Sequence, residues 1–158
     1  MAKSLGIIEL GVQYTMDTED SFLIKILSKV KLSTEKTKAE LIEVSVADLG
    51  FINGAVYCEI CAKGISLGMS LCRQEVGPQF YSQFKMKLSR RCNFAMMPVI
   101  DSDGDPIIFT MAPFFDDNDH ESELNWDICY PDDFFLGNDL FIFVLPQDQK
   151  FTALAWEP

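Results

Sequence analysis

The amino-acid sequence predicts a single α+β domain in which a largely antiparallel sheet carries two main helices. Three observations lead to this fold class. The chain has 158 residues, about the length of one domain. Apolar residues make up 48% of it, which is enough for a hydrophobic core. Most periodic segments alternate apolar and polar residues, and short turns rich in Gly and Asp separate them.

The first predicted elements are a strand and a helix. Residues 5–14 alternate between apolar and mostly polar side chains, the period of a half-buried strand. Residues 18–32 are expected to form a helix, with acids in the first turn and lysines in the last, as the helix dipole favours. Its apolar residues fall at helical spacing: Leu23, Ile26, Leu27 and Val30.

The next segments predict a meander of three strands. Residues 40–48, 55–62 and 65–72 each alternate with a period of two, and the turn sequences "FING" and "KG" separate them. The alternation is most regular in the third segment, with Ile65, Leu67, Met69 and Leu71 on one face.

A second helix and a hairpin should follow. Residues 77–92 place Pro78 near the helix start, with an apolar stripe of Phe80, Phe84 and Leu88. The apolar runs 94–100 and 106–112 flank "DSDGD", which is typical of a hairpin turn. Residues 139–146 are apolar on both faces and are expected to form a central strand, and residues 150–156 a last edge strand.

This order of elements, helix, three strands, helix, two strands, resembles the layout of type III secretion chaperones. The resemblance covers about residues 17–112 and concerns the order of elements. It implies a small acidic protein that binds an extended segment of an effector protein.

Charge is distributed unevenly along the chain. The net charge is -11, yet residues 1–91 contain twelve Lys or Arg and ten Asp or Glu. Residues 92–149 contain thirteen Asp or Glu and no Lys or Arg. Such a composition argues against nucleic-acid binding and against adhesion to anionic membranes, since both need basic residues. We therefore expect one acidic face, formed by about residues 101–139.

Residues 114–133 are the most acidic segment, with eight carboxylates. Aromatic residues interrupt them, which is unusual for a disordered acidic tail. Aromatic anchors among charges are typical of a protein interface. The residues expected to bind a basic partner are Asp116, Asp117, Asp119, Glu121, Glu123, Trp126, Asp127, Tyr130, Asp132 and Asp133. The alternative is a solvated acidic loop over a core that contains the aromatic rings.

Other candidate sites are weaker. Asp101, Asp103 and Asp105 resemble a calcium loop, but the Gly and Glu positions of an EF-hand do not match. Cys58 and Cys61 lack a second pair of zinc ligands, and on a strand they would point to opposite faces. A redox role would need this pair at a helix N-terminus. His120 is the only histidine, and no Gly-rich elbow precedes any Ser, so no catalytic triad is indicated.

These features favour a non-catalytic protein-binding protein without a cofactor. The expected function is that of an immunity protein or antitoxin that caps a basic toxin, possibly a nuclease. The alternatives are a secretion chaperone or, less favoured, a metal-dependent enzyme that uses the Asp/Glu cluster. No export signal or membrane span is evident, and the five cysteines are an odd number, so we expect reduced thiols and a cytoplasmic protein. The sequence carries no signal for an oligomeric state.

Overall fold

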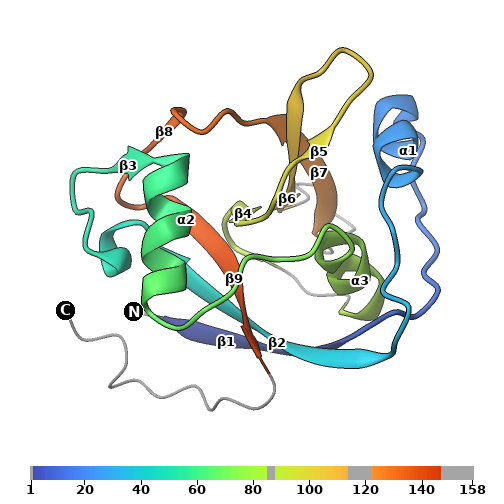
Figure 1. Ribbon diagram of the computed structural model, residues 1–158, viewed down its shortest axis with the longest axis horizontal. Helices are drawn as coiled ribbons and strands as arrows, with labels where there is room; N and C mark the ends of the chain where they lie inside the picture. Colours follow the sequence, from blue (N-terminus) through green and yellow to red (C-terminus); the bar gives the residue numbers. More distant parts are fainter. Residues whose placement is uncertain (1, 85–87, 114–121, 147–158) are drawn as a thin grey trace.

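The computed structural model describes residues 2–84, 88–113 and 122–146. Within them the chain forms a single α+β domain with a mixed, mostly antiparallel seven-stranded sheet, a small two-stranded sheet and three helices of at least seven residues (Figure 1). The predicted fold class is confirmed, with one helix more than expected. Among the described helices, none has the length and apolar character needed to cross a membrane.

Strand β9 lies inside the large sheet, between β2 and β4. The strands of this sheet are β1 (Lys3–Leu10), β2 (Thr37–Ser45), β4 (Cys92–Phe94), β5 (Val99–Ile100), β6 (Pro106–Ala112), β7 (Glu123–Ile128) and β9 (Leu140–Pro146). They are ordered β1-β2-β9-β4-β6, and β5 and β7 also pair with β6. The β4–β9 pair is parallel, whereas the other paired strands of the described chain are antiparallel. The small sheet joins β3 (Ala55–Val56) to β8 (Phe134–Phe135).

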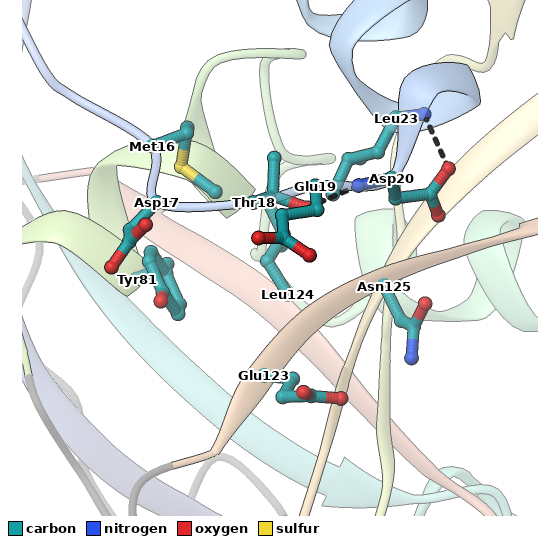
Figure 2. Close-up of a pocket in the computed structure, with 10 residues that line it drawn as sticks. All are labelled: Met16, Asp17, Thr18, Glu19, Asp20, Leu23, Tyr81, Glu123, Leu124 and Asn125. Atoms are coloured by element: carbon teal, nitrogen blue, oxygen red, sulfur yellow. Dashed lines mark hydrogen bonds between the residues drawn. The ribbon is translucent and has the colours of Figure 1, made fainter.

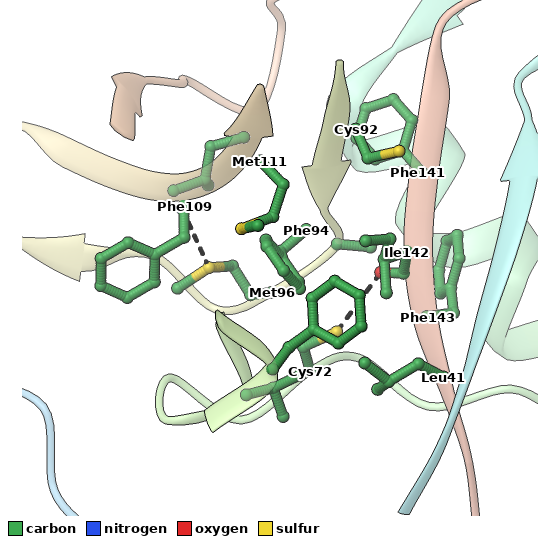
Figure 3. Packing of buried hydrophobic residues seen from close by; sticks show 14 of the residues in the cluster. Leu41, Cys72, Cys92, Phe94, Met96, Phe109, Met111, Phe141, Ile142 and Phe143 are labelled. Carbon is green, nitrogen blue, oxygen red and sulfur yellow. Dashed lines mark hydrogen bonds between the residues drawn. The ribbon is translucent and has the colours of Figure 1, made fainter. Parts of the chain in front are cut away.

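Strand β9 forms the centre of the core, as its sequence predicts. Phe141, Ile142 and Phe143 are fully buried, so both faces of this strand are covered. Figure 3 shows Phe143 and Ile142 on opposite sides of β9. The Cys72 thiol donates a hydrogen bond to the carbonyl of Ile142, which ties the segment after the second helix to this strand.

Helices cover both faces of the sheet. Helix α2 (Tyr57–Ser66) packs on the face of Phe143, where a Cβ added to Gly64 would lie 2.2 Å from the Phe143 ring. Glycine is therefore required for this close approach. Helix α3 (Val76–Gln83) packs on the opposite face, with Phe80 against Phe94 at a ring-centroid distance of 6.3 Å.

Helix α1 (Ser21–Leu27) packs on β7 through Phe22 and Trp126 and is shorter than the predicted 18–32 (Figure 1). It begins where the Asp20 carboxylate accepts hydrogen bonds from the amides of Phe22 and Leu23, as an N-cap does. Its last turn ends at Ser28, whose hydroxyl bonds the carbonyl of Lys25. Leu23 and Ile26 are its buried residues.

The prediction of strands at 55–62 and 65–72 is wrong for most of their length, because Tyr57–Ser66 forms α2. Within the described chain, the only parts of the two predicted strands with β pairing are Ala55–Val56, which is β3, and the isolated bridges of Ser70 and Cys72. Val56, Cys58, Ile60 and Ala62 fit a period of two. The residues that are in fact buried, however, recur at helical spacing: Tyr57, Ile60, Cys61 and Gly64. Gly68 then ends the helix at φ +96°, with the Met69 amide bonded to the carbonyl of Gly64, as in a Schellman motif.

Other predicted boundaries also move. The first strand ends at Leu10 instead of 14, and the second predicted helix, 77–92, is confined to α3. Phe84 is already extended, although it and Leu88 still pack on the core. The hairpin around "DSDGD" is confirmed. The predicted last strand, residues 150–156, lies outside the described chain. With α2 in place of two strands, the element order that resembles secretion chaperones is not found.

A buried carboxylate connects three parts of the fold that are distant in sequence. Glu75, at the start of α3, is 1% exposed. It accepts hydrogen bonds from the Gly11 amide at 2.9 Å and the Ser33 amide at 2.8 Å. Gly11 lies at φ +77°, a conformation that side chains disfavour. Glu75 therefore fixes the end of β1 and the approach to β2 against α3.

We expect Glu75→Ala to lower the free energy of unfolding by about 2–5 kcal/mol, because it leaves the part-buried amides of Gly11 and Ser33 without this acceptor. Glu75→Gln should cost less, since one oxygen remains. Burial and, second, the Glu75 charge raise the pKa of Tyr14, so that pKa should fall in Glu75→Gln. Urea denaturation measures the change in the free energy of unfolding, and a titration of Tyr14 measures the change in its pKa. The exposed control Glu59→Ala should change stability by about 0.5 kcal/mol or less; equal stability of Glu75→Ala and this control would contradict the role of Glu75.

Candidate acidic binding site

An acidic cleft of about 370 Å³ lies between the segment before α1, helix α3 and strand β7. Figure 2 shows its side chains around the hollow, with Glu19 from the segment before α1 and Glu123 from β7. Its lining residues are Met16, Asp17, Thr18, Glu19, Asp20, Leu23, Tyr81, Glu123, Leu124 and Asn125. Four of them are carboxylates and none is Lys or Arg, so charges of one sign are concentrated in a concave surface.

Helix α3 holds in place the segment before α1, which forms one wall of this cleft. Gln79 is fully buried, and its side-chain amide donates a 2.6 Å hydrogen bond to the carbonyl of Val12. One turn later, Gln83 both accepts from the amide of Glu9 and donates to its carbonyl. These bonds to the backbone hold β1 and the chain beyond it against α3. The same helix contributes Tyr81 to the cleft.

The four carboxylates of the cleft differ in what they bind. Asp20 is engaged in the helix cap and also accepts a 3.0 Å hydrogen bond from Trp126 Nε1. The Trp126 bond, followed by the two cap amides, lowers the pKa of Asp20. Within the described chain, the carboxylates of Asp17, Glu19 and Glu123 have no ion-pair or hydrogen-bond partner. These three are therefore available to an external cation.

Trp126 is half-buried instead of standing free as an anchor. Its ring packs on Phe22 of α1 at a centroid distance of 4.1 Å and contacts the hydrophobic core. Its indole N–H is satisfied by Asp20. Trp126 therefore joins β7 to α1, and only part of its ring remains open to a partner.

The predicted residues after β7 form a separate acidic loop, defined here as residues 129–133. The Asp133 carboxylate accepts a 2.8 Å hydrogen bond from the Tyr130 amide and so closes the loop. The Tyr130 hydroxyl bonds Asp105, which raises the pKa of that tyrosine. Asp132 is exposed. The backbone of the loop also caps α2, because the carbonyls of Asp133 and Pro131 accept from the amides of Tyr57 and Cys58.

The structure thus divides the predicted interface. Glu123 lies in the cleft, whereas Tyr130, Asp132 and Asp133 lie beyond the other end of β7. Asp127 forms an ion pair with Arg91, and both side chains are about half exposed. Four predicted residues, Asp116, Asp117, Asp119 and Glu121, lie outside the described chain, as does His120.

Sequence reasoning missed Asp17, Glu19 and Asp20 as part of this surface. The signal was present as the acidic run "DTED". It was interpreted only as a favourable charge at a helix start, because residues 1–91 carry a small positive balance. A larger cleft, of about 500 Å³, differs in charge, because it brings Arg90 together with Glu43 and Asp48.

The "DSDGD" carboxylates act as turn-forming groups. Asp101 Oδ1 accepts from the amides of Asp103 and Asp105 at 2.9 and 2.8 Å, which organises the hairpin turn. In the parts of the chain that the structure describes, no three His, Cys, Asp or Glu side chains are arranged to hold a metal ion.

An apolar groove of about 380 Å³ lies beside α2, on the face of the sheet opposite the acidic cleft. Its wall includes the thiols of Cys58, Cys61 and Cys129. All five cysteines are free; Cys58 is exposed and the other four are buried. Burial raises the pKa of Cys61 to about 11 and that of Cys129 to about 12.

No protein-family model, curated protein or solved structure matches this chain significantly. The functional argument therefore depends on the geometry and charge of these surfaces.

We predict that Trp126→Phe raises the pKa of Asp20 toward its ordinary value, because it removes the indole donor and retains a ring against Phe22. The low pKa stabilises the fold above the unfolded-state pKa of about 3.9, and this contribution disappears as the pH falls through the lower folded-state value. Carboxyl NMR titration of Asp20 measures the shift. An unchanged Asp20 titration in Trp126→Phe would show that the indole bond is not formed in solution.

Proposed function

We propose that the protein binds a basic protein partner through the acidic cleft, with the adjoining acidic surface of β7 and residues 129–133 extending the contact. The observation that carries this proposal is the cleft itself, which combines four carboxylates with no Lys or Arg. Three of these carboxylates have no partner within the described chain. A concave surface of one charge sign attracts oppositely charged side chains and speeds their encounter.

The specific function we propose is that of an immunity protein or antitoxin that caps a basic toxin, possibly a nuclease. A nuclease cleft carries Lys and Arg to hold phosphates, so an acidic surface with aromatic residues is complementary to it. Part of the Trp126 ring and the exposed Tyr130 would supply the aromatic contacts. We propose a cytoplasmic location and no role for nucleic acid, membrane or cofactor.

A secretion chaperone remains the second candidate, and the apolar groove beside α2 favours it. A chaperone would use such an apolar surface to hold an extended segment of an unfolded effector. An immunity protein would instead use the acidic cleft against a folded enzyme. The two functions therefore differ in which face of the sheet binds the partner.

The test compares two double variants that change the net charge equally. Glu19→Lys with Glu123→Lys reverses the cleft, whereas Glu35→Lys with Glu59→Lys reverses exposed residues elsewhere. The partner is captured from the organism's own lysate on the wild-type protein, and its association rate is measured by surface plasmon resonance. We expect the cleft variant to associate at least about tenfold more slowly and the control to resemble the wild type.

Added salt should also slow association with the wild type, because exposed charges are screened beyond about 8 Å at 0.15 M. Equal slowing in both double variants would indicate an effect of net charge alone. A cleft variant that binds at the wild-type rate would contradict the proposal. A captured partner that binds only as an unfolded segment, and loses binding on substitution of the groove, would favour the chaperone.

A further inference from the structure

The cysteine pair in the sequence "CEIC" occupies the first turn of α2. Cys58 is the second residue of this ten-residue helix, and Cys61 lies three residues further on. On a strand the two thiols would point to opposite faces. On a helix, residues three apart lie on one face with Cα atoms about 5 Å apart, within the range that a disulfide spans. Their Cβ atoms, about 5–6 Å apart in a regular helix, must move about 1–2 Å closer when the bond forms. The condition that a redox pair must meet, a position at a helix N-terminus, is therefore satisfied.

The two thiols differ in accessibility. Cys58 is exposed, whereas Cys61 is 8% exposed. An external disulfide can therefore reach Cys58 first. Cys61 is then placed to attack the mixed disulfide that forms on Cys58. Both thiols line the apolar groove, which is open to solvent at Ile65 and Met97, 52% and 66% exposed.

The environment of Cys61 favours this order of events. Burial raises the pKa of Cys61, a hydrogen bond with Tyr57 lowers it, and the negative charge of Cys58 raises it again. Burial is the largest of these causes and keeps the Cys61 thiol protonated, so Cys58 is the thiol that attacks an external disulfide first.

Charges beside the pair indicate which disulfide it takes. The first turn of α2 is bonded to the acidic loop, because the Cys58 amide donates to the carbonyl of Pro131 at 2.9 Å and the Tyr57 amide to that of Asp133 at 2.9 Å. This contact brings the acidic loop that contains Asp132 and Asp133 to the turn of α2 that carries Cys58, and Glu59 follows Cys58 directly in the helix. A cationic disulfide is therefore attracted and an anionic one repelled.

We propose that Cys58 and Cys61 form a dithiol–disulfide redox site that reacts with cationic disulfides. The Cys58 thiolate attacks one sulfur of the disulfide RSSR, forms a Cys58–SR bond and releases RS⁻. Cys61 then loses its proton to solvent and attacks the Cys58 sulfur, which forms the Cys58–Cys61 disulfide and releases the second RS⁻. Two protein thiols are oxidised, and one RSSR is reduced to two RSH.

The experiment treats the reduced, folded full chain with cystamine, a cationic disulfide, traps remaining thiols by alkylation in acid, and maps the products by mass spectrometry. The wild type should lose two thiols, retain no cysteamine and yield a Cys58–Cys61 disulfide. Cys61→Ser should accumulate cysteamine on Cys58, whereas Cys58→Ser should stay unmodified. Cys129→Ser, a buried thiol of the same groove, is the matched control and should react like the wild type.

Charge selectivity is tested by comparing cystamine with oxidised glutathione, which is anionic. Cystamine should react several-fold faster, and Asp132→Asn should reduce this ratio; equal rates would overturn the cationic selectivity. A stable cysteamine adduct on Cys58 of the wild type, a disulfide that includes Cys129, or no reaction would overturn the site itself. Circular dichroism verifies that each variant is folded, and Cys61→Ala replaces Cys61→Ser if the latter unfolds.

Discussion

The buried carboxylate of Glu75 is the constraint on which the arrangement of the domain depends. A buried charge is costly unless hydrogen bonds surround it, and here two backbone amides and the Ser33 hydroxyl supply them. These donors come from the end of β1 and the approach to β2. Their hydrogen bonds to the Glu75 side chain therefore fix both segments against α3. The Arg73 side chain adds a hydrogen bond to the Ser33 hydroxyl from the solvent side.

The acidic cleft is a consequence of that arrangement. Glu75 and Gln79 hold the chain after β1 on α3, and that chain continues into the acidic residues before α1. Helix α3 also contacts β7, which brings Glu123 to the opposite wall. Carboxylates more than a hundred residues apart in sequence thus share one hollow.

Two sets of acidic residues differ in what they bond. Asp20, Asp101, Asp133 and Asp139 accept hydrogen bonds from nearby backbone amides and shape helix starts and turns. Asp17, Glu19 and Glu123 lie in the cleft and accept no hydrogen bond within the described chain. The cleft's part of the proposed interface depends mainly on the second set, because charges engaged with the backbone have less to offer a partner.

Local patterns in the sequence predicted the elements that local physics determines. The apolar run of β9 and the Asp-Gly turn at 101–105 needed no knowledge of the rest of the chain. Helix α2 was missed because Ile60 belongs to both a period-2 and a helical pattern, and Gly68 was read as part of a strand when it ends the helix. That error also caused the Cys58–Cys61 pair to be dismissed as a redox site.

The cleft could not be predicted from sequence, since it depends on how the sheet brings β7 to α3 and on long-range bonds such as that of Trp126 to Asp20. Its central property, a concentrated negative potential, can be measured without the partner. NMR relaxation enhancement by cationic and anionic nitroxide cosolutes should show the strongest preference for the cation at amides of residues 16–20 and 122–125. A preference that is uniform over the surface, or strongest away from these residues, would contradict the account.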